Sequence, residues 1–133
     1  MVSSTRPIHR TTRLTVIALL MALPACSRNQ PGEAIDPSAP AIMTFNNESL
    51  VQADVFAIAQ GSNAMRIGTV MGGRTETLRI PADVANRGSI RIVARLLASS
   101  ALPSSGPIAI RPGEHLDVRL PLDQRTLVVL PGS

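Results

Sequence analysis

The sequence predicts an all-β fold, an antiparallel β-sandwich of about seven to eight strands, over residues 41–133. Three observations predict it. Apolar and polar residues alternate with a period of two in short runs, turn residues interrupt these runs every eight to twelve positions, and no long helical period occurs. A segment of this length has room for a core, although a modest one.

Each strand is expected where the alternation runs between two turn signals. The expected strands, in chain order, cover residues 42–46, 50–59, 64–70, 75–80, 89–98, 108–111, 114–122 and 125–130. The side chains expected to point into the core are Ile90, Ile92, Ala94, Leu96, Leu116, Val118 and Leu120. Val51, Ala53, Val55 and Ala57 are expected to share one face of their strand, and Leu78 and Ile80 one face of theirs.

Turns and connectors fill the gaps between these strands. Residues 46–48, 61–63 and 71–73 carry the asparagines and glycines of tight turns. Residues 81–88 are a connector with room for one helical turn. Residues 108–122 are expected to form a hairpin that turns at Pro112 and Gly113.

The charges argue against nucleic acid as a partner. All thirteen cationic side chains are arginines, and three of them precede residue 14. From Cys26 onward ten arginines face nine acidic residues, so this part of the chain is close to neutral. The only aromatic residues are Phe45 and Phe56. The chain therefore lacks both the basic stripe and the stacking platform that nucleic-acid binding needs.

The N-terminal segment has the pattern of a secretory signal peptide. Residues 1–13 are basic and contain no acid, and Leu14–Ala25 form a run of twelve nearly unbroken apolar residues. A permanent transmembrane helix needs about 20 such residues. A basic region followed by a short apolar helix instead predicts export.

The only cysteine, Cys26, stands directly after this run, in the sequence Leu23-Pro24-Ala25-Cys26. This motif resembles the lipobox of bacterial lipoproteins, although Pro24 stands where that family usually has alanine or serine. The resemblance implies a signal peptide at 1–25, diacylglycerol on the Cys26 thiol and usually a further acyl chain on the new amine. Ser27, in place of aspartate, implies sorting to the outer membrane. The alternative is cleavage after Ser27 or beyond, which would give a soluble periplasmic or secreted protein.

Residues 26–40 are expected to be a lipidated cysteine followed by a flexible tether, since the segment holds three prolines, a glycine and little apolar periodicity. The domain that follows is expected to be an immunoglobulin-like or transthyretin-like sandwich, although the cysteine pair, tryptophan and tyrosine typical of immunoglobulin domains are missing. The order of its motifs is similar to that in small bacterial lipoproteins with one β-domain. These motifs are Arg66–Val70, Leu78–Pro81, Ile90–Ala94 and Pro112–Glu114. This resemblance implies no particular activity.

Candidate catalytic groups are sparse. His115, Asp117 and Arg119 alternate on one strand and could begin a metal or proton-transfer site, but the sequence offers no further ligand and a solvated strand face explains them as well. The glycines of Gly68–Arg74 lack the spacing of a phosphate-binding loop and are expected to form a hairpin turn. The serines at 99, 100, 104 and 105 lack a nucleophile motif. We therefore expect that the protein is not an enzyme and that it binds no metal and no cofactor. The alternative in this class is a hydrolase that uses His115.

The expected contact surfaces are a loop and a row of arginines. Residues 99–107 are the longest irregular segment of the domain, and Ser104 and Ser105 in it are candidate partner or ligand contacts. Arg79, Arg91 and Arg95 are expected to form a cationic row that could meet lipid phosphates or an anionic glycan. The residues Thr126–Leu130 could pair with a partner strand or belong to the core.

The sequence thus predicts a membrane-anchored, non-enzymatic lipoprotein that serves as a structural or protein-binding module of the bacterial cell envelope. Its membrane contact would be the acyl chains on Cys26, and its other partner would be an envelope protein. The alternative is a periplasmic carrier of a small ligand or glycan, held by residues 99–107 and the arginines.

Overall fold

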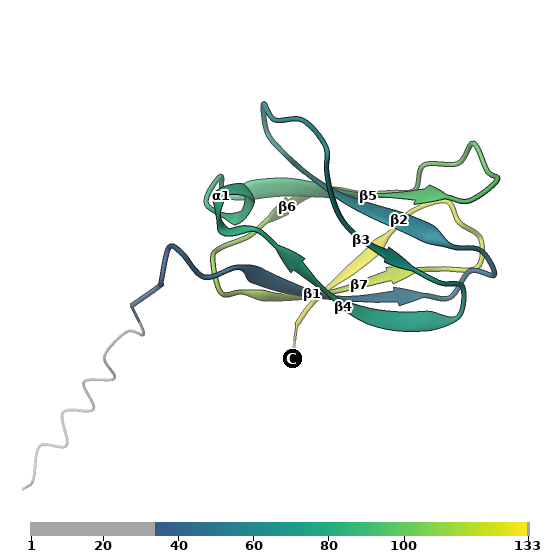
Figure 1. Ribbon diagram of the computed structural model, residues 1–133, viewed down its shortest axis with the longest axis horizontal. Helices are drawn as coiled ribbons and strands as arrows, with labels where there is room; N and C mark the ends of the chain where they lie inside the picture. The colour runs from purple at the N-terminus through teal and green to yellow at the C-terminus, as the bar shows by residue number, and fades with distance from the viewer. Residues whose placement is uncertain (1–33, 133) are drawn as a thin grey trace, which may run out of the picture. The chain divides into compact units, whose positions relative to one another are not determined.

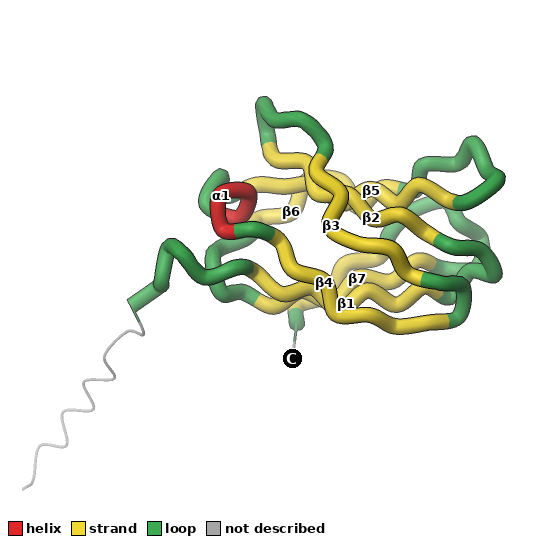
Figure 2. Tube along the Cα trace, in the orientation of Figure 1, coloured by secondary structure: helices red, strands yellow, loops and turns green. Residues whose placement is uncertain are grey.

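The computed structural model describes residues 34–132 and confirms a β-sandwich of two four-stranded sheets (Figures 1 and 2). The elements are β1 (Ala41–Asn47), β2 (Ala53–Ala59), β3 (Met65–Val70), β4 (Arg74–Ile80), α1 (Ala82–Ala85), β5 (Ser89–Leu96), β6 (Ser104–Ala109), β7 (His115–Leu120) and β8 (Val128–Pro131). The signal peptide, the motif Leu23-Pro24-Ala25 and Cys26 lie outside the described residues.

One sheet has the strand order β4-β1-β7-β8 and the other has the order β3-β2-β5-β6. All neighbouring strands are antiparallel except β1 and β7, which are parallel. The prediction of a purely antiparallel sandwich is therefore wrong for the first sheet. Parallel neighbours need a long crossover connection, and here the whole second sheet lies between β1 and β7 in the chain.

Two predicted hairpins are connections between the sheets. Residues 108–122 were expected to fold back at Pro112 and Gly113, and the turn does form there, with φ of 77° at Gly113. However, β6 belongs to one sheet and β7 to the other. The turn at Met71–Gly73 likewise joins β3 to β4 across the sandwich. A turn motif fixes only the local reversal of the chain, so it leaves open which sheet the next strand enters.

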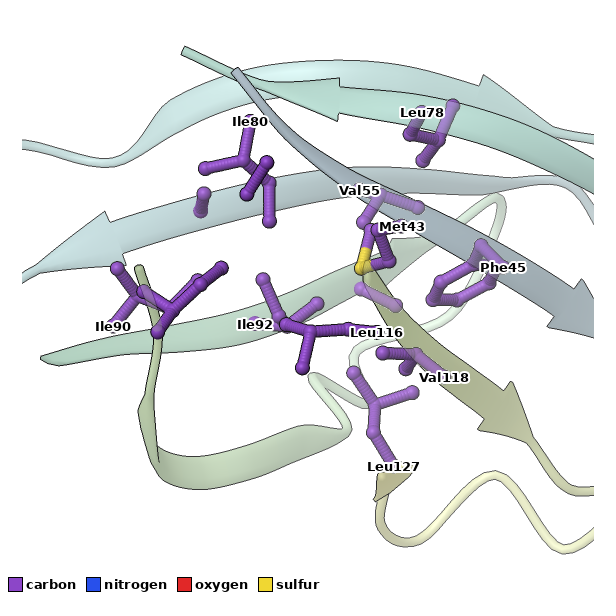
Figure 3. Close-up of a cluster of buried hydrophobic side chains, with 14 of the residues drawn as sticks. Met43, Phe45, Val55, Leu78, Ile80, Ile90, Ile92, Leu116, Val118 and Leu127 are labelled. Atoms are coloured by element: carbon purple, nitrogen blue, oxygen red, sulfur yellow. The ribbon is translucent and has the colours of Figure 1, made fainter. Parts of the chain in front are cut away.

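The core lies between the two sheets and is built by the period-two pattern (Figure 3). The burial pattern of β1 and of β2 alternates strictly along all seven residues of each strand. The predicted inward side chains of β5 and β7 are buried, and so are the residues of β2 and β4 that were predicted to share one face. Val51 is only partly buried, because it lies in the loop before β2 begins. Phe45 is the largest of the fully buried side chains, and the rest of the core is aliphatic.

A buried polar group closes the end of β1. Asn47 and Ser49 are fully buried, although the sequence predicted an ordinary turn at residues 46–48. Asn47 Nδ2 donates to the carbonyl oxygens of Val51 (2.9 Å) and Val70 (3.1 Å). Asn47 Oδ1 accepts from the Ser49 amide (3.1 Å) and hydroxyl (2.6 Å). The side chain thus joins the end of β1 to the start of β2 and the end of β3.

The last part of the expected tether forms a turn with one side-chain hydrogen bond to the domain. Residues 36–39 form a turn in which the Ala39 amide donates to the Asp36 carbonyl (3.1 Å). Asn86 Nδ2, which follows α1, donates to the carbonyl of Pro37 (2.8 Å). The flexible tether expected for residues 26–40 stays a prediction; the turn and this bond describe only its last residues. The expected helical turn in the 81–88 connector is confirmed as α1.

Candidate functional site

The sandwich has two distinct ends. The chain enters β1 at one end, the near end, where α1 and the connections β2–β3 and β6–β7 also lie (Figure 1). At the far end, Asn47 of β1 lies beside Arg74 of β4 and Leu120 of β7, and Ala53 of β2 lies beside Val70 and Leu96. Four connections therefore meet at the far end: residues 48–52, 71–73, 97–103 and 121–127.

Each of these four connections exposes at least one large apolar side chain. We call these side chains the apolar tip: Leu50, Met71, Leu97, Leu102 and Leu122. Leu50 is 89% exposed, and the other four are 59–67% exposed. In residues 34–132 only Ile35, Met65 and Leu130 are further exposed large apolar residues, and they lie elsewhere. Scattered exposed apolar side chains are normal, whereas a collected group marks an interaction surface.

The sequence patterns concealed the apolar tip. Leu50, Leu97 and Leu122 fall at or next to an end of the expected strands 50–59, 89–98 and 114–122. In the structure β2 begins at Ala53, β5 ends at Leu96 and β7 ends at Leu120. The signal that could have revealed the tip is the pair of consecutive apolar residues Leu96-Leu97, which breaks the alternation.

Hydrogen bonds between the connections hold the tip in place. The Gly73 amide donates to the carbonyls of Asn47 (2.8 Å) and Ser49 (3.0 Å). The Leu97 amide donates to Gln52 (2.9 Å), so the 48–52 connection is bonded to two of its neighbours. A Cβ atom on Gly72 would lie 2.5 Å from the Leu50 carbonyl carbon, so only glycine fits beneath Leu50. The connections that carry Leu50 and Met71, and the start of the one that carries Leu97, are therefore bonded to one another.

The second candidate surface is the outer face of sheet β3-β2-β5-β6, centred on Asp54. Asp54 lies opposite Thr69 on β3 and Arg95 on β5, and this register gathers four polar side chains. Arg66 Nη2 donates to Asp54 Oδ1 (2.7 Å), Arg95 Nη2 donates to Oδ2 (3.0 Å), and the Thr69 hydroxyl donates to Oδ1 (2.9 Å). Arg66 Nη2 also contacts the Thr69 hydroxyl oxygen. The Arg95 guanidinium lies 5.4 Å from the ring centroid of Phe56.

This cluster predicts a pH-dependent contribution to stability. The hydrogen bond from Arg95, followed by that from Thr69, lowers the pKa of Asp54 to about 2. The carboxyl of an unfolded chain has a pKa of about 3.9, so ionised Asp54 stabilises the fold above pH ~4. This stabilisation is lost as the pH falls from about 4 through about 2. Because the arginines are half-exposed, we expect about 1 kcal/mol.

Asp54→Asn should therefore lower the free energy of unfolding by about 1 kcal/mol at pH 7 and by much less near pH 2. Urea denaturation of both chains across this pH range measures the difference. A difference that stays constant from pH 7 to pH 2 would show that the charge of Asp54 is not what stabilises the cluster.

The predicted cationic row of three arginines does not form. Arg91 and Arg95 lie on β5 and share the outer face, but Arg79 lies on β4, which belongs to the other sheet. The prediction is wrong because it rested on outward positions without knowledge of the sheet partners. In addition, the charge of Arg95 is offset by Asp54.

Ser104 and Ser105 are part of a strand and not of a loop. Residues 104–109 form β6, so the irregular segment is shorter than predicted. Ser105 Oγ accepts from the Ile92 amide (3.0 Å) and donates to the Gly106 carbonyl (2.7 Å), so it serves the backbone. The sequence misled because Gly106 and Pro107 are loop residues by type, yet β6 is an edge strand, where proline is tolerated.

The outer face of the other sheet carries the predicted histidine. His115, Asp117 and Arg119 share this face on β7, as expected. His115 Nε2 lies 2.8 Å from the Thr44 hydroxyl and 3.7 Å from Asp117 Oδ1, and Arg119 lies 3.7 Å from Glu48. Among residues 34–132 no three histidine, cysteine, aspartate or glutamate side chains gather as metal ligands would. These contacts describe a hydrogen-bonded polar face.

The remaining motifs have structural roles. Gly68 faces Leu78, and a Cβ on it would lie 2.5 Å from the Leu78 methyl carbon Cδ2, so this glycine closes the contact between β3 and β4. The C-terminal apolar run becomes the edge strand β8 of four residues, and Leu127 before it is buried. Because β8 is an edge strand, it could still pair with a strand of a partner, as the sequence suggested.

Within the described part of the chain no helix is long and apolar enough to cross a membrane. The chain matches no protein-family profile, and a search of curated proteins finds no match. A role for the apolar tip or for the outer face around Asp54 therefore has to rest on the geometry and chemistry of these surfaces.

Proposed function

We propose that this chain is a membrane-anchored lipoprotein and that its sandwich is a non-enzymatic protein-binding module of the bacterial cell envelope. The observation that carries this proposal is the apolar tip. Five exposed apolar side chains from four separate connections lie at one end of the domain. Fully burying one leucine contributes about 1.5–3 kcal/mol, so a partner with an apolar surface that covers the tip would gain several times this amount.

The position of the tip supports the same proposal. The chain enters the domain at the near end, and β1 separates that end from the tip by roughly 23 Å at 3.3 Å per residue. Residues 26–35, between the proposed lipid anchor and the docked turn, span at most roughly 35 Å. A domain held through Cys26 can therefore present its tip away from the bilayer, toward a partner in the periplasm. We propose the periplasmic side of the outer membrane as its location, on the strength of Ser27.

Site-specific crosslinking in intact bacterial cells tests the proposed function. A photoreactive amino acid would replace Leu50, Leu97 or Leu122 in the full chain, and Arg87 or Glu114 at the near end for comparison. We expect adducts larger than the monomer from the tip positions and not from the near-end positions. Recovery of only the monomer from all five positions would contradict a protein-binding role.

The strand order bears on the finer class of the sandwich. In immunoglobulin domains the first two strands lie side by side in one sheet. Here β1 and β2 lie in different sheets, and each sheet has four strands. Of the two expected arrangements, this order favours a transthyretin-like sandwich.

The alternative function, a carrier of a small ligand or glycan, loses two of its supports. Ser104 and Ser105 bond to the backbone of β5 and β6, and Arg79 lies on the opposite sheet. The third arginine of the predicted row, Arg91, lies beside an open part of the surface.

A further inference from the structure

A depression lies on the outer face of sheet β3-β2-β5-β6, at the near end and away from the apolar tip. Its volume is roughly 420 Å³, within the range of small-molecule sites. The side chains that line it and could recognise a ligand are those of Ile58, Gln60, Ser62, Ser89, Arg91 and Pro107. The near-end loop Gln60–Ser62 and the edge strand β6 form its two sides.

Arg91 differs from the other arginines of this face in its neighbours. Arg66 and Arg95 are both bonded to Asp54. Arg91 instead lies opposite Ile58 on β2 and Pro107 on β6, neither of which can accept a hydrogen bond through its side chain. Among the described residues no carboxylate lies within ion-pair distance of Arg91. Its guanidinium donors are therefore available to a ligand.

The backbone explains why the depression exists. The register between β5 and β6 shifts between Arg91 and Val93, and Gly106 has a φ of 72° beside this irregularity. Irregularities of this kind bend the edge strand and leave its ladder locally incomplete. Pro107 lies opposite Arg91 and has no amide hydrogen, which an edge strand such as β6 tolerates.

We infer that this depression binds the oxyanion of a small molecule, a carboxylate or a phosphate, attached to a compact organic group. The guanidinium of Arg91 can donate two parallel hydrogen bonds to such an anion. The hydroxyls of Ser62 and Ser89 and the amide of Gln60 supply uncharged donors around it. Ile58 and Pro107 offer apolar contact to the organic group. This site is independent of the lipid anchor and of the apolar tip.

The test is a titration of the isotope-labelled full chain, kept soluble in detergent micelles, followed by amide NMR spectra. The probes are glycerol 3-phosphate, succinate and inorganic phosphate, with glycerol as the uncharged comparison. We expect saturable shifts of the Gly61, Ser62 and Arg91 amides with glycerol 3-phosphate or succinate, and none with glycerol. The organic anion that binds more tightly shows whether the site prefers a phosphate or a carboxylate. Weaker binding of inorganic phosphate than of glycerol 3-phosphate would show that the organic group contributes to the affinity.

Arg91→Gln should weaken the binding at least tenfold, and Arg91→Lys, which keeps the charge but not the planar fork, should weaken it less. Arg87→Gln removes an exposed arginine outside the depression and should leave the binding unchanged. Arg91 is exposed, so both variants should keep the fold, and their spectra show this directly. Shifts that do not saturate, or that are equal in Arg91→Gln, would overturn the proposal.

Discussion

Replacement of Asn47 by alanine should lower the free energy of unfolding by about 3 kcal/mol. The side chain is fully buried and uses both of its polar atoms: the nitrogen donates to Val51 and Val70, and the oxygen accepts from Ser49. Alanine would leave two buried carbonyls and the Ser49 donors without these partners. A buried polar group without its partner costs about 1–3 kcal/mol, and such costs within one network do not simply add.

The neighbouring asparagine provides the control for this prediction. Asn46 is only partly buried and points to the outer face of its sheet, so Asn46→Ala should change the stability by no more than about 0.5 kcal/mol. Chemical denaturation followed by circular dichroism measures both variants. A loss below about 1 kcal/mol in Asn47→Ala would mean that water readily replaces the asparagine.

Phe45→Ala should have a larger effect than Asn47→Ala and lower the free energy of unfolding by about 3–5 kcal/mol. Phe45 is fully buried and is the largest of the fully buried side chains, and its neighbours are aliphatic residues of both sheets (Figure 3). Removal of the ring leaves a cavity that a close-packed core fills only in part. Because a domain of this size has a total stability of about 5–15 kcal/mol, this loss removes a large part of it.

Phe56 allows a matched comparison, since it is the other aromatic residue of the chain. Its ring lies partly exposed on the outer face, against Arg95. Phe56→Ala should therefore lower the free energy of unfolding by about 1 kcal/mol. Thermal unfolding of the two variants gives the comparison, and equal losses would contradict the assignment of Phe45 to the core.

The sequence was sufficient to predict most strands of the domain, although it placed residues 104–107 of β6 in a loop. Alternation along β2, β5 and β7 identified the strands and their buried side chains, because a half-buried strand must place apolar residues at every second position. It was not sufficient to predict which strands are neighbours. The turns at Gly73 and Gly113 have the same local chemistry whether the next strand pairs with the previous one or crosses to the other sheet.

The candidate surfaces depend on these non-local pairings, so they could be predicted only in part. Arg91 and Arg95 were correctly placed on one outward face, but the partner of Arg95 is Asp54, more than forty residues earlier in the chain. The register of β2 and β5 brings the two together, and no spacing along the sequence encodes it. The apolar tip is likewise a product of topology, since its five side chains come from four connections that meet only in the folded domain.

The proposed attachment to the membrane rests on Cys26, so the most direct measurement is the intact mass of the mature protein extracted from bacterial membranes. We predict a mass equal to that of the chain from Cys26 to Ser133 plus a diacylglyceryl group and, where the amine is acylated, one further acyl chain. An unmodified chain that begins at Cys26 or later would contradict the anchor. It would indicate a soluble periplasmic or secreted protein, in which the depression beside Arg91 and not the apolar tip would be the first candidate for function.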